Sequence, residues 1–178
     1  MSWRSTAPAL VWALVWALLV AFAAGTWASR DAVRGQAPAL PPLAVDGGPV
    51  SLERLRGRPV LVHFWASWCR ICSLEQESIA ALADAHAVVT VAMQSGPAEE
   101  VAAWLGSRGL GFVTVADPAG ELAARYGVRG VPTSFFLDRA GRVRFVTQGY
   151  TTPVGLRLRL WLAGLWPVSG AAGGPDTP

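Results

Sequence analysis

The chain has only two cysteines, and they stand three positions apart in "FWASWCRIC", from Phe64 to Cys72. Two thiols at this spacing could bind a metal ion, cross-link the fold or exchange disulfides with other molecules. A structural zinc site needs four ligands, and the two histidines of the chain do not complete a finger-like spacing. A purely structural disulfide would add little stability because it closes too short a loop. Redox exchange is therefore favoured, while Cu(I) binding by the two thiolates and a non-catalytic protein-binding role stay open.

The elements around the pair also favour redox chemistry. Residues 59–65, "PVLVHFW", form a short apolar run that predicts a buried strand. From Cys69 onward the pattern predicts a helix with one apolar face and a polar start. The apolar face consists of Cys72, Ile79, Leu82, Ala83 and His86, and the polar start of Glu75, Gln76 and Glu77. Cys69 would then lie at the helix N-terminus, where free N–H groups and the helix dipole favour a thiolate. Cys72 would lie one turn further on the same side, close enough to form a disulfide.

The helix dipole cannot by itself bring the pKa of Cys69 to near neutrality. Its contribution of about 0.3–1 kcal/mol is less than one pKa unit. Hydrogen bonds or a nearby cation must supply the rest. Arg70, between the two cysteines, could contribute part of that charge, or it could point into solvent, where screening removes most of its effect.

The rest of the chain predicts alternating strands and helices. Strands are expected at residues 87–93 and 112–116, helices at 98–109 and 118–127, a hairpin over 133–148, and a final helix over 152–166. This order predicts an α/β domain with a mixed central sheet flanked by helices, spanning residues 40–167. The cysteines would lie where the first buried strand passes into the first long helix.

The N-terminal region is strongly apolar. No charged residue occurs between Ser5 and Ser29, and a helix of this length matches a hydrocarbon core of roughly 30 Å. We therefore predict a transmembrane helix that makes residues 1–29 a membrane anchor in contact with the lipid bilayer through residues 5–29. A cleaved signal peptide is the alternative, although the apolar stretch exceeds the usual length of such a segment. A flexible linker over residues 30–39 and a disordered tail over 168–178 complete the predicted organisation.

The formal net charge of +3 and the pI near 9.5 raise the question of nucleic-acid binding. The sequence lacks the interleaved aromatic and basic residues that would support it, so no nucleic-acid partner is expected. The densest basic run, from Arg54 to Arg58, predicts a solvated turn, with an anionic-lipid or partner patch as the alternative.

Two motifs together resemble a known family. "FWASWCRIC", followed roughly sixty residues later by "GVRGVPTSFFLDRAGRVRF", is similar to the thioredoxin superfamily, and more narrowly to its membrane-anchored, periplasmic TlpA-like thiol-disulfide oxidoreductases. The "GYTT...GLRLRLWL" ending resembles the ScsD-like protein disulfide oxidoreductases. The resemblance implies a thioredoxin-like fold in which Cys69 is the attacking thiol and Cys72 the resolving thiol. It also implies that Trp68 covers the site, and that a cis bond at Val131–Pro132 lies against the cysteines and presents Val131 to a substrate strand.

One position departs from the family pattern. Thioredoxins resemble one another in carrying a buried acid six residues before the first cysteine, and this chain has His63 there. A histidine could act as a base near neutral pH, or, when protonated, stabilise the Cys72 thiolate. It could equally be a neutral, hydrogen-bonded core residue. His86 is expected to be structural or to interact with the helix C-terminus.

The expected function is thiol-disulfide exchange with protein substrates outside the cytoplasm, as a reductase in preference to an oxidase. The protein would be a single-pass protein of a bacterial inner membrane, with its domain on the periplasmic side and a membrane electron-donor protein as its reductant. No tightly bound cofactor and no metal are expected besides the redox-active Cys69–Cys72 pair. The sequence leaves the direction of electron flow and the client open. Apocytochrome c, a copper-stress protein and another secreted protein are candidate clients.

Overall fold

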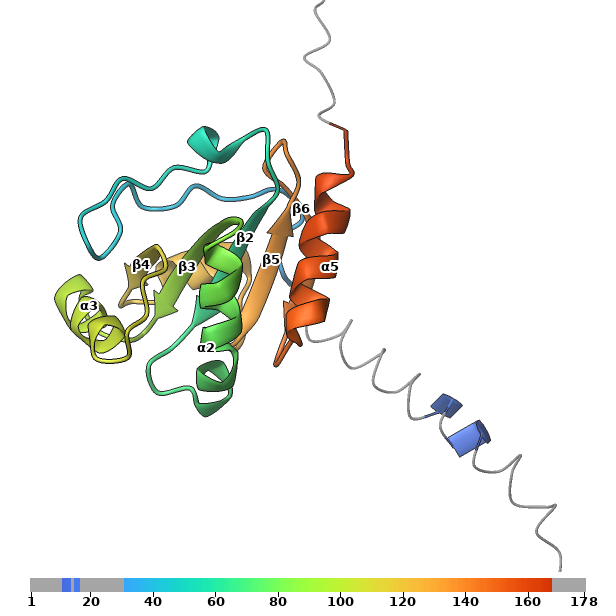
Figure 1. Cartoon of the computed structure of the whole chain (residues 1–178), viewed down its shortest axis with the longest axis horizontal. Helices are drawn as coiled ribbons and strands as arrows, with labels where there is room; N and C mark the ends of the chain where they lie inside the picture. The colour runs from blue at the N-terminus through green and yellow to red at the C-terminus, as the bar shows by residue number, and fades with distance from the viewer. Residues whose placement is uncertain (1–10, 14, 17–30, 168–178) are drawn as a thin grey trace, which may run out of the picture.

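The computed structural model describes residues 11–13, 15–16 and 31–167 of the chain (Figure 1). Residues 11–13 and 15–16 are helical. Most of the predicted anchor and the whole predicted tail, 168–178, lie outside the described residues. Within the described part of the chain, no helix is both long enough and apolar enough to span a bilayer.

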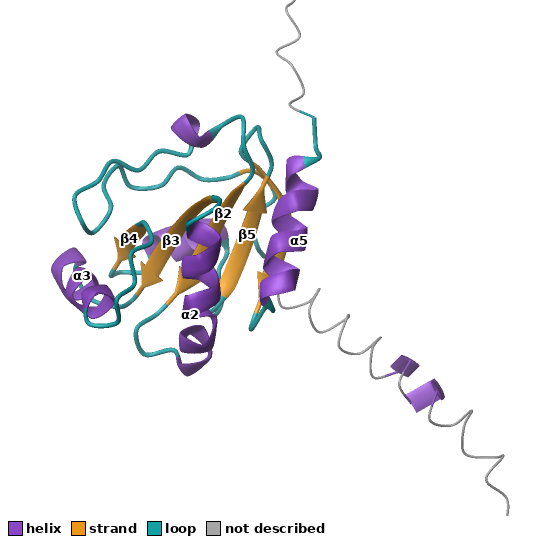
Figure 2. Ribbon diagram, viewed as in Figure 1, coloured by secondary structure: helices purple, strands orange, loops and turns teal. Residues whose placement is uncertain are grey.

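A six-stranded mixed sheet forms the centre of the domain, in the order β1-β6-β5-β2-β3-β4. Its strands are β1 (Gly35–Gln36), β2 (Val60–Trp65), β3 (Ala87–Met93), β4 (Thr114–Asp117), β5 (Thr133–Leu137) and β6 (Arg142–Gln148). The helices are α2 (Arg70–Ala83), α3 (Ala98–Gly106), α4 (Glu121–Tyr126) and α5 (Pro153–Gly164), with a short 3-10 turn at Glu53–Leu55. β2 pairs in parallel with β3 and antiparallel with β5, which confirms the mixed sheet flanked by helices (Figure 2).

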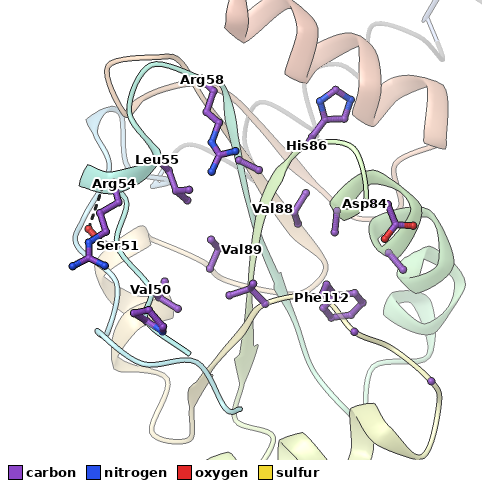
Figure 3. Close-up of a pocket in the computed structure, with 17 residues that line it drawn as sticks. Val50, Ser51, Arg54, Leu55, Arg58, Asp84, His86, Val88, Val89 and Phe112 are labelled. Atoms are coloured by element: carbon purple, nitrogen blue, oxygen red, sulfur yellow. Dashed lines mark hydrogen bonds between the residues drawn. The ribbon is translucent and has the colours of Figure 1, made fainter. Parts of the chain in front are cut away.

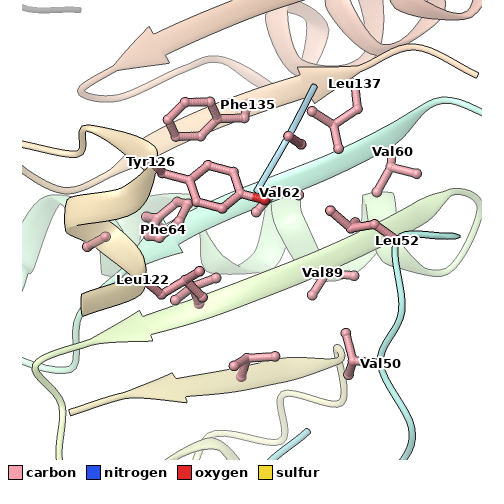
Figure 4. Packing of buried hydrophobic residues seen from close by; sticks show 14 of the residues in the cluster. Val50, Leu52, Val60, Val62, Phe64, Val89, Leu122, Tyr126, Phe135 and Leu137 are labelled. Atoms are coloured by element: carbon pink, nitrogen blue, oxygen red, sulfur yellow. The ribbon is translucent and has the colours of Figure 1, made fainter. Parts of the chain in front are cut away.

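The central strand β2 is buried over its whole length, as its unbroken apolar run predicts. Because successive side chains alternate between the two faces, β2 contributes to two separate cores. Phe64 packs on one face with Tyr126 and Phe135, at ring-centroid distances of 5.0 and 5.6 Å (Figure 4). Trp65 lies on the other face, in the core that α2 and α5 cover. The loop that carries the cysteines therefore follows a strand that is anchored in both cores.

Residues 31–39 differ from the predicted flexible linker, because they pack against the domain. β1 pairs with β6, and Ala32 and Ala37 are buried. Val33 donates its N–H to the Tyr126 carbonyl at 3.0 Å, and the Tyr126 hydroxyl donates to the carbonyl of Pro38 at 2.7 Å. The small alanine side chains that suggested a tether instead allow close packing under α4. The folded domain thus includes residues 31–39, which the sequence placed outside it.

Gly127 permits this close packing. It ends α4 with a φ of +68°, in the left-handed region, and a Cβ at this position would collide with the backbone of Asp31. Arg129, two residues further on, forms an ion pair of 2.6 Å with Asp31. The start of the domain is therefore attached directly to the loop that leads into β5.

The last helix resolves a mixed signal in the sequence. Leucine and arginine alternate over residues 156–160, yet these residues lie within α5. The N-cap Thr152 of this helix accepts a hydrogen bond from the N–H of Gly155. Leu156, Leu160 and Ala163 are its buried contacts with the sheet and α2. A helix start of Thr followed by Pro at N1 thus prevails over the period-two pattern.

Candidate active site

The two cysteines form a disulfide at the start of α2, directly after the loop that follows β2. Cys69 is the N-cap of the helix, and its Sγ accepts a hydrogen bond from the N–H of Cys72 at 3.1 Å. The helix dipole and this N–H both favour negative charge on the Cys69 sulfur. In the reduced protein, the same groups would stabilise a thiolate at Cys69 and not at Cys72.

The two sulfurs differ in how far they can be reached. Cys69 retains 8% of its surface, whereas Cys72 is completely buried. Of the two cysteines, only Cys69 therefore has surface that an incoming thiolate or disulfide could reach. This asymmetry matches the attacking and resolving roles that the family resemblance implies.

Val131 and Pro132 lie beside the disulfide, although they are about sixty residues away in the sequence. The peptide bond between them is cis, as expected, and the carbonyl oxygen of Val131 lies 3.7 Å from the Sγ of Cys69. Pro132 is buried, and its carbonyl accepts a hydrogen bond from the N–H of Gly149 at 2.8 Å. The loop before β5 therefore forms one wall of the site.

The loop that carries Trp68 is held by the end of β3. The N–H of Ser67 donates to the hydroxyl of Ser95 at 2.9 Å, and the indole N–H of Trp68 donates to the carbonyl of Gln94 at 3.0 Å. Gln94 has a φ of +48°, which is uncommon for a residue other than glycine. Trp68 nevertheless keeps 60% of its surface exposed next to Cys69.

Arg70 is the first residue of α2 and is exposed. It makes no hydrogen bond or ion pair with the part of the chain that the structure describes. Water and salt screen an exposed charge of this kind strongly. The helix dipole and the Cys72 N–H are thus the groups that the structure directs at the Cys69 sulfur, and a supporting role of Arg70 stays a prediction.

His63 lies in β2 and is almost completely buried, on the same face of the strand as Leu61 and Trp65. Its Nδ1 is 2.9 Å from the hydroxyl of Ser134, on the paired strand β5. Burial lowers the pKa of His63 to about 4, because the imidazolium loses its hydration there. Of the alternatives for His63, the structure therefore favours the neutral, hydrogen-bonded core histidine over a cation that stabilises the Cys72 thiolate.

A buried acid is nevertheless present, at Glu75. The predicted polar start of the helix is wrong for Glu75 and Gln76, which are 1% and 6% exposed. The Oε1 of Glu75 accepts a hydrogen bond from the N–H of Thr151, while its Oε2 has no hydrogen-bond partner within the described residues. Burial raises the pKa of Glu75 to about 7, and the Thr151 hydrogen bond opposes this increase only in part.

The spacing of α2 contained a signal for Glu75. Its buried positions are Cys72, Glu75, Gln76, Ile79 and Leu82, which follow the i, i+3, i+4, i+7 pattern of one helix face. We missed the signal because carboxylates are usually exposed, so "EQE" suggested a polar start of the helix. A carboxyl group thus lies one helical turn beyond the resolving cysteine.

One cavity in the described part of the chain lies away from the cysteines. It has a volume of about 500 Å³ and lies between residues 49–58, the end of α2 and residues 109–113 (Figure 3). Val50, Val88 and Phe112 contribute apolar walls, and Arg54 and Arg58 line it as well. None of the predicted site residues lines this cavity. Within the described residues, no group of three or more His, Cys, Asp or Glu side chains could hold a metal ion.

The fold and the site together define a thiol-disulfide oxidoreductase with a thioredoxin-like fold. An asymmetric disulfide at a helix N-terminus, next to a cis-proline loop, is suited to thiol-disulfide exchange. Residues 33–146 match the AhpC/TSA family, and the chain belongs to that family.

Known relatives agree with this class. The chain is 37% identical to a thioredoxin-like protein of Haemophilus influenzae over 121 residues, which are 67% of this chain and 72% of the relative. It is 33% identical to the thiol:disulfide interchange protein DsbE of Xylella fastidiosa over 102 residues, 56% of this chain and 52% of that protein. The chain thus spans about half the length of this DsbE.

Solved structures extend the likeness to the fold. The structure of a thiol:disulfide interchange protein of Chlorobium tepidum has a TM-score of 0.63 and 26% identity, covering 75% of this chain and 98% of that one. The pneumococcal exposed lipoprotein thioredoxin Etrx1 of Streptococcus pneumoniae has a TM-score of 0.61 and 28% identity, covering 70% of this chain and 99% of that one.

Proposed function

We propose that this protein is a membrane-tethered reductase of protein disulfides that acts on the outer side of a bacterial inner membrane. The observation that carries the chemical part is the combination of a reachable Cys69 at a helix N-terminus and a fully buried Cys72. No cofactor is required besides the cysteine pair.

The reaction follows from this asymmetry. The Cys69 thiolate attacks one sulfur of a client disulfide, the client S–S bond breaks, and the departing client thiolate takes up a proton. Cys72 then loses its proton and attacks the Sγ of Cys69, which releases the second client thiolate and forms the Cys69–Cys72 disulfide. Two electrons pass from the enzyme to the client. A dithiol protein in the membrane returns them by the reverse exchange.

Glu75 supplies a base for the second step. A thiol with an ordinary pKa of about 8.5 is mostly protonated at neutral pH, so Cys72 needs a proton acceptor. Glu75 lies on the same face of α2 as Cys72, and its pKa of about 7 keeps a large fraction of it ionised at neutral pH. His63, with a pKa of about 4, is the weaker base of the two buried groups.

The surface around Cys69 suits apolar protein clients. Trp68, Ile71 and Leu74 are 60%, 50% and 71% exposed, and they lie at the start of α2 on either side of Cys69 in the sequence. Exposed apolar residues beside a reactive group favour binding of unfolded or locally open chains. The backbone of Val131 would pair with the client strand at the opposite wall.

The location outside the cytoplasm rests on two observations. The uncharged stretch from Ser5 to Ser29 is long enough to span a bilayer, and the two cysteines of the active pair are the only thiols, so no other thiol could be oxidised there.

Delivery of Cu(I) by the same thiolates is the alternative. It is less well supported, because Cys72 has no exposed surface for a metal ion to reach. Copper stoichiometry of the reduced chain separates the two functions.

Replacing Ile71 and Leu74 together with serine tests the proposed client surface. We expect kcat/KM for insulin reduction by the full chain to fall about tenfold, because apolar contacts with the protein substrate are lost. Reaction with a small aromatic disulfide should be unchanged, because Cys69 is intact. Val113→Ser, an exposed apolar residue away from α2, is the matched control. Equal losses with both substrates would show that the two residues support the site and do not bind clients.

A further inference from the structure

The outer side of α5 carries an apolar stripe that nothing in the described structure covers. Four large residues are 50–74% exposed and recur at i, i+4, i+7 and i+11, which places them on one face of the helix: Val154, Leu158, Trp161 and Leu165. The buried residues Leu156, Leu160 and Ala163 lie on the opposite face, against the sheet and α2. α5 lies at the edge of the domain, so this outer stripe faces away from the molecule (Figure 1).

The charges near the outer stripe are positive. α5 contains no acidic residue, and its Arg157 is exposed without an ion pair or hydrogen bond to any described residue. Near the C-terminal end of the helix, Arg139 and His86 line a small cavity together with Trp161 and Leu165. Arg144 lies over the ring of Trp166 at 5.1 Å, and its charge is paired with the buried Asp138 at 2.7 Å. Apolar and tryptophan side chains bordered by arginine are the composition of helices that lie in the interface of anionic membranes.

The start of the domain also limits its distance from a bilayer. Ala32 is already buried and Val33 is hydrogen-bonded to Tyr126, while the predicted membrane segment ends at Ser29. The three Cα–Cα steps from Ser29 to Ala32 span at most about 11 Å. Such a tether keeps the domain close to the membrane surface.

We propose that the outer stripe of α5 docks onto the surface of a bilayer that contains anionic lipids. The leucine, valine and tryptophan side chains enter the headgroup region, and Arg157 and Arg139 contact lipid phosphates. The inference takes the membrane location from the proposed function and does not depend on its redox chemistry.

Docking would have a consequence for the active site. α5 packs along α2, and Glu75 of α2 accepts the hydrogen bond of Thr151 just before α5 begins. The helix that carries Cys69 is thus fixed relative to the docked helix. Cys69 would be held at a constant height above the bilayer, where a dithiol donor embedded in the membrane could reach it.

Fluorine NMR on the full chain labelled with fluorotryptophan tests the docking. The chain is mixed with vesicles of phosphatidylcholine and phosphatidylglycerol that contain a lipid with a paramagnetic headgroup. We expect the Trp161 signal, assigned with Trp161→Phe, to broaden strongly, while the signal of the buried Trp65 stays sharp. Trp12 and Trp16, in the predicted anchor, report on the tether in the same spectrum.

Two variants and a control sharpen the test. Arg157→Gln should lower the docking equilibrium constant about fivefold on anionic vesicles, as expected for loss of one cation near such a surface. Leu158→Gln should reduce the broadening of Trp161 on every vesicle. Arg142→Gln, an exposed arginine on β6, should change nothing.

The signals of Trp12, Trp16, Trp65 and Trp161 separate the possible results. If the Trp12 and Trp16 signals broaden while that of Trp161 stays sharp, the tether stands and the docking is overturned. If Trp161 alone broadens, docking stands and the tether of the proposed function fails. Broadening of Trp161 that is unchanged in Arg157→Gln would overturn the proposed contact of Arg157 with anionic lipid. A Trp161 signal that shifts with protein concentration and not with lipid would point to a second copy on this face and would overturn the proposal.

Discussion

Replacing Cys72 with serine is expected to convert the enzyme into a covalent trap, whereas Cys69→Ser abolishes exchange altogether. The chain has no other cysteine, so each variant carries a single thiol. Cys69 is the cysteine that retains exposed surface, and in the Cys72→Ser variant it can attack a client disulfide but cannot be displaced by a second cysteine. The mixed disulfide should therefore accumulate and disappear on addition of dithiothreitol.

The measurement is mass spectrometry of the full chain after incubation with an oxidised protein client, under acid quench. Cys72→Ser should gain the mass of the client, and Cys69→Ser should not. Turnover of insulin should fall to background in both variants, because each lacks one of the two exchange steps. A client adduct on Cys69→Ser would show that the buried Cys72 is the first nucleophile and would contradict the site as described.

The second large effect concerns the buried residues Glu75 and His63, whose titrations should change the stability of the protein with pH in opposite directions. The pKa of Glu75 is raised from 4.5 to about 7, so the folded state binds more protons than the unfolded state and stability falls as pH rises between these values. The pKa of His63 is lowered from 6.5 to about 4, so stability falls as pH decreases between these values. Each effect amounts to roughly 3 kcal/mol at about 1.4 kcal/mol per pKa unit.

In the wild-type chain the two effects oppose each other, and single variants should reveal them. Glu75→Gln keeps an acceptor for the Thr151 N–H and removes the titration, so its unfolding free energy should fall toward acid more steeply than that of the wild type. The unfolding free energy of His63→Asn should instead fall as the pH rises from about 4.5 to 7. Urea unfolding at several pH values measures both slopes, with His86→Asn, at an exposed histidine, as the control.

The same variants separate a catalytic effect from a structural one. If Glu75 accepts the proton of Cys72, Glu75→Gln should slow release of the client from the mixed disulfide and flatten the pH dependence of that step near pH 7. His63→Asn should leave that pH dependence in place. A Glu75→Gln variant with unchanged pH dependence of release would exclude Glu75 as the base.

The sequence was most informative where a single periodicity runs unbroken. The strand at 87–93 was predicted with its correct bounds, and β2 with an error of one residue. Both strands are buried on both faces, which leaves little ambiguity in their sequence pattern. The cysteine pair was predicted from its place after a buried strand, and its contact with the cis-proline loop from a resemblance. The structure places the Cys69 Sγ 3.7 Å from the Val131 carbonyl oxygen. Spacing along the chain could not have shown that contact between positions 69 and 131.

The errors have a common physical origin. Residues 31–39 and the Glu75–Gln76 pair were assigned to solvent from their composition, and both are packed against distant parts of the chain. Ala32 is buried where Gly127 allows a close backbone approach. Glu75 is buried where the loop before α5 provides a donor. Composition alone does not show long-range partners of this kind, so it misplaces the residues that depend on them. For Glu75, the helical spacing of α2 was the better guide.

The reduction potential of the Cys69–Cys72 pair tests the central claim most directly. The full chain, held in lipid or detergent, would be equilibrated with reduced and oxidised glutathione and its free thiols trapped by alkylation. A reductase of client disulfides requires a potential well below about −200 mV, and this is the value we predict. A potential near about −120 mV would identify an oxidant and would contradict the proposed direction of electron flow.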